Sequence, residues 1–284
     1  KGLIVAQFSI SVFLITYTLI ILQQMNFLKQ KNLGYNKEHL LVLPIDNKIA
    51  ENFTSIKEAV QQVNGVETVT ASYETPEYIQ WGDGIQVTDD KGLHDISLNA
   101  LPVDLDFTKT MKMQLLSGRD FQQSDFALMD TNNNNANYRD AYLINESLAK
   151  KIGWTPEQAV NKTIQKGYTG TVVGVVKDFN FESLHEPVKP LLIFLSRDLA
   201  RTMLVRLNGA DVQSTIGRLE MLWKQSVTHR PFEYHFLDED YNKLYITEQR
   251  SSALFSVAAG LAILLACLGL FGLAAFTTVQ RTKE

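Results

Sequence analysis

The stretch HLLVLPIDNKIAENFTSIKEAVQQVNGVETVTASY, residues 39–73, decides the fold. It begins with an apolar, strand-like run at 39–45, and its apolar residues over 51–63 have helical spacing. Asn-Gly at 64–65 is a turn signal, and residues 66–73 alternate between apolar and polar side chains, as a half-buried strand does. The stretch therefore predicts a β-α-β unit.

A second unit of the same kind lies near the other end of the chain. TMLVRL at 202–207 is typical of a strand, residues 211–227 have helical apolar spacing, and FEYHFL at 232–237 is again strand-like. Two β-α-β units that flank an insert predict an α+β fold with a split sandwich of ferredoxin-like type.

The insert, residues 91–190, carries elements of its own. We expect these to be a turn at 89–92, a short helix around 104–113, a strand and helix over 141–153, and a strand at 171–179. Within the third of these, Asn145 is a good N-cap and Gly153 a good helix stop. Residues 130–140 are rich in Asn and predict a loop.

Outside this region, two long segments carry no charge. The chain is 20% charged, yet residues 2–22 and 251–280 contain none of its 27 Lys and Arg or 31 Asp and Glu residues. As helices they would reach roughly 31 Å and roughly 45 Å, enough for a bilayer core. The first run is too long for a signal peptide and lacks a cleavage pattern. We therefore expect two transmembrane helices rather than buried core helices.

Both helices carry residues suited to helix packing. Polar side chains on one face of the first and small residues at three- and four-residue spacing in the second favour contact with other helices, although Gly and Ala are also simply common in membrane helices. The candidates are Gln7, Ser11, Thr18, Ala258, Ala262, Ala266, Gly269 and Gly272.

The chain between the folded region and each uncharged segment predicts a rigid stalk. The first helix is expected to continue to about Asn32 and to stop at Gly34. Asp238 is a good N-cap, and no Gly or Pro occurs over 238–259, so one unbroken helix is expected there. Two such stalks would transmit motion, with a static tether as the alternative. The transmission candidates are Asp238, Tyr241 and Tyr245.

No pattern in the sequence indicates catalysis. The chain has no phosphate-binding P-loop, so any ATP hydrolysis must belong to another polypeptide. Its five His residues lack metal-ligand spacing, and Cys267 is the one cysteine. We therefore predict no catalytic residues, no cofactor and no metal. The region between the two uncharged segments has 24 basic and 30 acidic residues, a net charge of −6, which argues against a nucleic-acid surface.

Several stretches resemble a known family. KNLGYNKEHLLVL at 31–43, DFNFESLHEP at 178–187, and GLFGLAAF at 269–276 with the final RTKE are similar to bacterial ABC transporter permeases of the MacB/FtsX type. The likeness covers essentially the whole chain and is strongest to the long Bacteroidetes-style members, which carry two copies of a helix–domain–helices unit. We expect this chain to be a segment of such a permease, from its second copy.

The resemblance implies an extracytoplasmic two-lobed domain between two transmembrane helices. One lobe would be the split β-α-β lobe, called porter-like, and the other the insert, called sabre-like. The expected divisions are 1–32 for the first helix and stalk, 33–90 and 191–237 for the porter-like lobe, 91–190 for the sabre-like lobe, and 238–284 for the second stalk and helix.

The family mechanism implies a permease subunit that transmits ATP-driven motion from a partner ATPase to the periplasmic domain, in efflux, lipoprotein or envelope roles. Implied partners are the ABC ATPase subunit, the rest of the permease or a second copy, a periplasmic or envelope partner, and membrane lipid. The implied location is the bacterial inner membrane, with residues 33–237 extracytoplasmic. Topology alone also permits a two-span membrane sensor or chemoreceptor with an extracytoplasmic ligand-binding domain.

Overall fold

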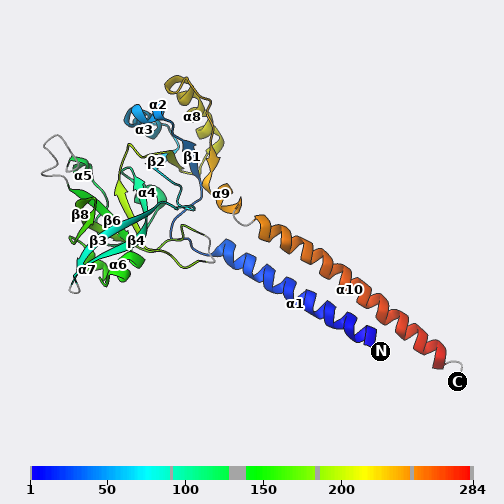
Figure 1. Cartoon of the computed structure of the whole chain (residues 1–284). Helices are drawn as coiled ribbons and strands as arrows, with labels where there is room; N and C mark the ends of the chain where they lie inside the picture. The colour runs from blue at the N-terminus through cyan, green and yellow to red at the C-terminus, as the bar shows by residue number, and fades with distance from the viewer. Residues whose placement is uncertain (1, 90–91, 128–138, 183–185, 244–245, 282–284) are drawn as a thin grey trace. The chain divides into compact units, whose positions relative to one another are not determined.

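The computed structural model describes residues 2–89, 92–127, 139–182, 186–243 and 246–281 (Figure 1). The chain forms two compact units. One is Asn32–Tyr241, and the other combines Lys1–Lys31 with Asn242–Glu284. Each unit is described by itself below.

The first lobe of the unit Asn32–Tyr241 is built on four strands in the order β11-β1-β10-β2. Their bounds are β1 Leu40–Pro44, β2 Val66–Ser72, β10 Thr202–Leu207 and β11 His235–Phe236. β10 is antiparallel to both β1 and β2, and β11 is antiparallel to β1. Each β-α-β unit is therefore split by a strand of the other, which is the predicted ferredoxin-like topology.

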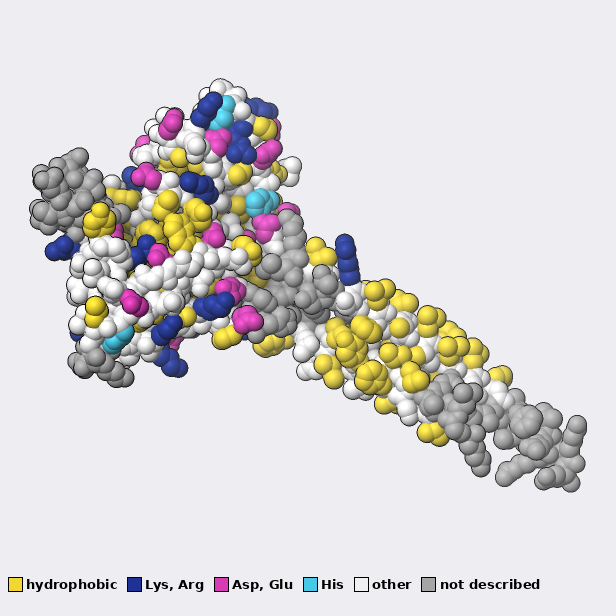
Figure 2. Space-filling model, viewed as in Figure 1, with side chains coloured by type: hydrophobic (Ala, Val, Ile, Leu, Met, Phe, Trp, Pro, Cys, Tyr) yellow, Lys and Arg dark blue, Asp and Glu magenta, His cyan; other side chains and the backbone are white. Residues whose placement is uncertain are grey.

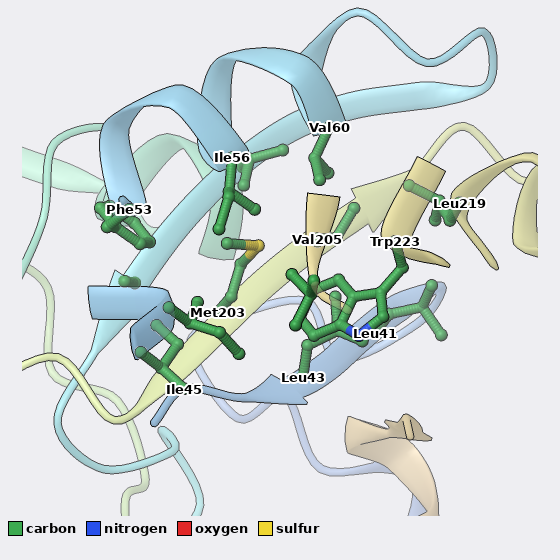
Figure 3. Close-up of a cluster of buried hydrophobic side chains, with 14 of the residues drawn as sticks. Leu41, Leu43, Ile45, Phe53, Ile56, Val60, Met203, Val205, Leu219 and Trp223 are labelled. Atoms are coloured by element: carbon green, nitrogen blue, oxygen red, sulfur yellow. The ribbon is translucent and has the colours of Figure 1, made fainter. Parts of the chain in front are cut away.

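Three helices cover one face of this sheet. They are α2 Asn47–Glu51, α3 Phe53–Gln61 and α8 Val212–Ser226. Figure 3 shows Ile56 of α3 and Trp223 of α8 pointing toward Val205 of β10. The side-chain carboxylates of Asp46 and Asp211 accept hydrogen bonds from the first turns of α2 and α8, as N-caps do.

Two predictions for this lobe need correction. The helix expected over 51–63 instead begins at Asn47, because Asp46 caps it there, and it is interrupted at Asn52, where the backbone leaves helical geometry. The strand expected over 232–237 is reduced to β11, and Leu237 already begins α9, Leu237–Lys243. Asp238 therefore lies in the first turn of α9 rather than at its N-cap.

The second lobe is a ring of six strands. Along the ring the order is β4-β3-β7-β8-β6-β9, and β9 pairs back with β4. The bounds are β3 Gly82–Asp89, β4 Gly92–Val103, β6 Asp140–Asn145, β7 Thr163–Lys166, β8 Tyr168–Val176 and β9 Leu191–Leu195. β5, Leu115–Gly118, pairs with β8 outside the ring. The ring includes β3 and β9, which lie just outside the predicted insert of 91–190.

Apolar side chains of the ring strands form a second core together with α6, Glu146–Ile152. Asn145 caps α6 and Gly153 ends it in the left-handed region, as predicted. Two short helices, α5 Gln123–Ala127 and α7 Pro156–Ala159, also belong to this part of the chain, whereas α4, Phe107–Met111, packs against β2 and β10 of the first lobe. Most of the predicted Asn-rich loop at 130–140 lies outside the described residues.

The sheets of the two lobes meet through one pair of residues. Ser72 of β2 pairs with Val103 of β4. Nearby backbone hydrogen bonds reinforce this contact, from Tyr73 N–H to the Pro102 carbonyl and from Asp104 N–H to the Ala71 carbonyl. We call this region the joint between the lobes.

The other unit is a pair of helices, α1 Gly2–Gln30 and α10 Ile246–Arg281, which contact each other. The ring of Tyr17 packs edge-on against Phe255, with centroids 4.7 Å apart. α1 ends at Gln30, slightly before the predicted Asn32. The unbroken helix predicted over 238–259 includes residues 244–245, which lie outside the described residues.

We predicted that these two helices cross a membrane. Among the residues that the structure describes, no helix has the combined length and apolar character that crossing a membrane requires.

Candidate functional site

The candidate site is the place where the chain enters and leaves the unit Asn32–Tyr241. It consists of a leading segment, residues 32–39, and a trailing segment, residues 235–241, which together we call the root. The trailing segment includes β11, which pairs with β1 directly after the leading segment. The two segments are therefore adjacent.

The leading segment is packed against residues 178–181 of the second lobe. Leu33 and Tyr35 are buried, and the Asn180 N–H donates to the Leu33 carbonyl over 2.8 Å. Gly34 has φ +87°, and a Cβ there would lie 2.7 Å from the Asp178 carbonyl oxygen. Only glycine meets both conditions. Two of the stretches that carried the family resemblance thus contact each other.

Arg206 fixes the leading segment to the sheet of the first lobe. Arg206 is only 2% exposed, next to the last residue of β10. The guanidinium donates to the carbonyls of Asn36 (2.5 Å), Glu38 (2.8 Å) and Thr110. Burial lowers the pKa of Arg206, and the charges of Glu67 and Glu38 oppose that shift. A buried cation held mainly by neutral carbonyls organises three backbone positions at once.

The trailing segment is held to the leading segment by a cation–π contact. The Lys37 ammonium lies 3.8 Å from the centroid of the buried Tyr241 ring. Burial lowers the pKa of Lys37, while the charges of Asp238 and Glu38 oppose the shift. Of the predicted transmission residues, the structure thus brings Asp238 and Tyr241 to Lys37. Tyr245 lies outside the described residues.

A buried carboxyl group faces the trailing segment. Glu77 is 7% exposed, and its Oε2 has no hydrogen-bond partner within the described part of the chain. Burial raises the pKa of Glu77 to about 7; a hydrogen bond with Thr75 opposes the shift and the charge of Asp240 adds to it. Asp240 also pairs with His235 at 2.5 Å. Protonation of Glu77 therefore affects the charge next to α9.

At the joint, a buried carboxylate holds two cations. Asp104 is fully buried, and it bonds Lys57 of α3 through Oδ2 (2.8 Å) and Arg197, which follows β9, through Oδ1 (2.9 Å). The hydroxyl of Thr70 donates to the Asp104 carbonyl over 3.3 Å. Lys57 belongs to the first lobe and Arg197 follows a strand of the second, so Asp104 links both.

The predicted packing residues fall into two groups. Thr18 and Ala266 are buried, and the Thr18 hydroxyl is 3.4 Å from the Phe255 carbonyl, which it shares with the nearer Leu14 carbonyl at 2.8 Å. Ala262 is half-buried, whereas Ala258, Gly269 and Gly272 are exposed. The side chains of Gln7 and Ser11 lie outside the described set. Their role in helix packing stays a prediction.

Sequence reasoning missed Arg206, Lys37, Glu77 and Asp104. Arg206 gave one usable signal, since it is the single charge in the apolar strand TMLVRL. The described residues contain no group of three or more His, Cys, Asp or Glu side chains placed to hold a metal ion. The root and the joint consist of packing, ion pairs and backbone hydrogen bonds.

Residues 3–222 match the family of the MacB-like periplasmic core domain. No curated protein matches the sequence. The fold is similar to the periplasmic region of MacB from Actinobacillus actinomycetemcomitans, with a TM-score of 0.50 and 14% identity over 76% of this chain and 97% of that chain.

Two further solved structures show the same general likeness. One is the extracellular domain of the noncanonic ABC-type transporter YknZ from Gram-positive bacteria, with a TM-score of 0.43 and 17% identity over 69% of this chain and 97% of that one. The other is a domain assigned to a permease protein from Porphyromonas gingivalis, with a TM-score of 0.46 and 15% identity over 71% and 90%.

Proposed function

Because this chain belongs to the MacB-like periplasmic core domain family, found in ABC transporter permeases, we propose that it transmits ATP-driven motion from a partner ATPase to its globular unit. It is a permease component, and the hydrolysis of ATP belongs to the partner, since the sequence has no P-loop. We also propose that residues 33–237 lie outside the cytoplasm, as the extracytoplasmic part of an inner-membrane transporter for efflux, lipoprotein or envelope work.

The observation that carries this proposal is the root. The leading and trailing segments are adjacent and are joined through Lys37 and Tyr241. Arg206 ties the leading segment to the central strand β10 by hydrogen bonds from a rigid, planar group. A displacement of either segment is therefore passed to the sheet of the first lobe instead of being absorbed in a loose linker.

The lobes then take the roles that the family suggests. The four-stranded lobe is the porter-like lobe and the ring of strands is the sabre-like lobe. The joint between them rests on one pair of strand residues and the Asp104 ion pairs, so we infer that relative movement of the lobes occurs there.

We further propose that the apolar parts of α1 and α10 contact lipid and other permease helices. Large apolar side chains are exposed along both, including Phe13 at 67%, Leu254 at 73% and Phe271 at 75%. Figure 2 shows such side chains over the visible face of the helix pair. Exposed apolar area of this kind indicates contact with lipid or another protein. Partners would be a second permease copy, the rest of the permease, or an envelope protein.

Hydrogen exchange tests the transmission proposal directly. The permease and its ATPase are reconstituted together in nanodiscs, and exchange of the amides in residues 33–39 and 235–241 is followed with and without ATP, using a hydrolysis-deficient ATPase. We expect ATP to change exchange in both segments. Tyr241→Ala should suppress that change without preventing assembly, and Lys112→Gln, on an exposed ion pair, is the matched control. Identical exchange with and without ATP would refute the proposal.

The single cysteine tests the lipid contact of α10. Cys267 is exposed on α10. In intact cells, a membrane-impermeant maleimide should label Lys112→Cys in a Cys267→Ser background but should leave Cys267 of the unmodified chain unlabelled. Equal labelling at both positions would show that this part of α10 faces water.

A further inference from the structure

A cleft beside the joint has the size of a ligand site. It is lined by α3, by the link from β4 to α4, and by Gln123 and Arg197, and its volume is ≈ 470 Å³. Small-molecule sites in proteins commonly have volumes of roughly 300–1,000 Å³. The cleft lies entirely within the unit Asn32–Tyr241, and it shares Lys57, Asp104 and Arg197 with the joint.

Arg197 presents an oriented guanidinium to this cleft. Its Nε donates to Asp104 Oδ1 at 2.9 Å, and its plane lies over the Phe126 ring, 4.2 Å from the centroid. The hydrogen bond to Asp104 holds one edge of the Arg197 guanidinium, and the Phe126 ring covers one of its faces. Its two terminal amino groups have no acceptor within the residues the structure describes. A guanidinium held in this way is suited to an oxyanion.

Two further groups that line the cleft have unused hydrogen-bonding capacity. Lys109 of α4 is exposed and has no ion-pair partner in the described part of the chain. Thr68 of β2 is 4% exposed, and its hydroxyl has no hydrogen-bond partner there. A buried hydroxyl without a partner is costly unless something outside the chain satisfies it. Lys109 and Thr68 therefore add a cation and a buried polar contact to Arg197.

The acidic residues of the cleft limit the charge of its ligand. Lys57 is already engaged by Asp104 at 2.8 Å and by Asp106 at 3.6 Å, so it has little left for a ligand. Asp106 and Glu58 also line the cleft. Their charges would repel a doubly charged phosphate monoester more than a single charge. Glutamine side chains from α3 and α5 complete the lining and offer both donors and acceptors.

We propose that this cleft binds a monoanionic group, a carboxylate or a phosphodiester, on a small polar body. Arg197 and Lys109 bind the anionic group of the ligand. Thr68 accepts or donates one hydrogen bond, and the glutamine side chains contact hydroxyl or amide groups in the rest of the ligand. Asp104 is a positioning residue, because it acts through Arg197.

Ligand-observed NMR titrations of the purified full chain in neutral detergent test this proposal. The probes are D-glucuronate, a sugar carboxylate, and glycerophosphoglycerol, the phosphodiester headgroup of a lipid without its chains. Glucose is the neutral control. Stronger binding of glucuronate would indicate a free sugar acid as the source, and stronger binding of glycerophosphoglycerol a lipid headgroup. Either result supports the site if glucose binds about tenfold more weakly or worse.

Matched variants decide whether the binding occurs in this cleft. Lys109→Gln is exposed and should weaken binding of the better probe by about tenfold, and the isosteric Thr68→Val by about threefold. Lys112→Gln, which removes an exposed ion pair with Glu67, should leave it unchanged. The proposal is overturned if neither anion binds below about 10 mM, if glucose binds as well as the anions, or if Lys109→Gln and Lys112→Gln behave alike.

Discussion

The root and the joint each contain a buried charged side chain, but the groups that pair with that charge differ between them. At the root, the buried Arg206 is surrounded by backbone carbonyls and close packing. At the joint, the buried Asp104 is matched by Lys57 and Arg197, whose side chains remain 15% and 32% exposed beside a cleft. The comparison teaches that the charge at the root is enclosed by the protein, whereas the charges paired at the joint keep partners that water can reach.

The largest expected effect comes from removing the root's cation. Arg206→Met leaves the carbonyls of Asn36, Glu38 and Thr110 without their donor in a buried site. We expect the free energy of unfolding to fall by about 3–5 kcal/mol, since each unsatisfied buried group costs about 1–3 kcal/mol. Urea titration of the full chain in detergent, followed by tryptophan fluorescence, measures it. If Arg206→Met lowered the free energy of unfolding by less than Asp104→Asn does, the root would contribute less to stability than the joint, against our expectation.

The next effect concerns pH at the root. The pKa of Glu77 is raised from 4.5 to about 7, so its contribution to stability is fully present below pH 4.5 and is lost as the pH rises to about 7. A shift of this size corresponds to at most about 3 kcal/mol. Glu77→Gln should remove this fall between pH 4.5 and 7 in the same titration. An unchanged pH profile in the variant would mean that another group is responsible.

A smaller effect measures how tightly the root is packed. Gly34→Ala places a Cβ 2.7 Å from the Asp178 carbonyl oxygen at φ +87°, whereas Gly153→Ala has nearly the same φ, +92°, with no atom within 4 Å of the new Cβ. We expect Gly34→Ala to cost about 2 kcal/mol more in the free energy of unfolding than Gly153→Ala. Equal losses of stability in the two variants would show that the leading segment can move to make room for the new Cβ.

The smallest effect is expected at the joint. Asp104→Asn removes the buried charge but keeps its shape, and the partly exposed Lys57 and Arg197 regain water. We expect a loss of about 1–2 kcal/mol in stability. Hydrogen exchange at residues 71–73 and 102–104 should increase more than exchange at the root. A uniform increase in both places would contradict a local weakening of the joint.

Patterns local in sequence predicted the first lobe well. The spacing of apolar residues located β1, β2, β10 and α8, and Asp211 caps α8 where its chemistry suggests. The prediction went wrong where one residue overrides a pattern, as Asp46 does at the start of α2.

The second lobe and the sites were less accessible to such reasoning. In the ring, Asn99 of β4 pairs with Leu191 of β9, and no spacing within either strand specifies a partner so distant in the sequence. The same limit hides the joint, because Lys57, Asp104 and Arg197 come from three separate segments. Only Arg206 showed its importance in the sequence, as a charge in an apolar strand, although not which carbonyls it would bind.

The closed ring of the second lobe also bears on how crowded copies of the protein behave. Each of its six strands pairs with two others of the ring, since β9 returns to β4. A strand with both sides occupied cannot template a strand from another molecule, which is the usual route to edge-to-edge aggregation. The weakest seam is between β3 and β7, where one residue pair, Gln86 with Gln165, closes the ring. Protection against strand exchange in this lobe therefore depends on the integrity of that seam.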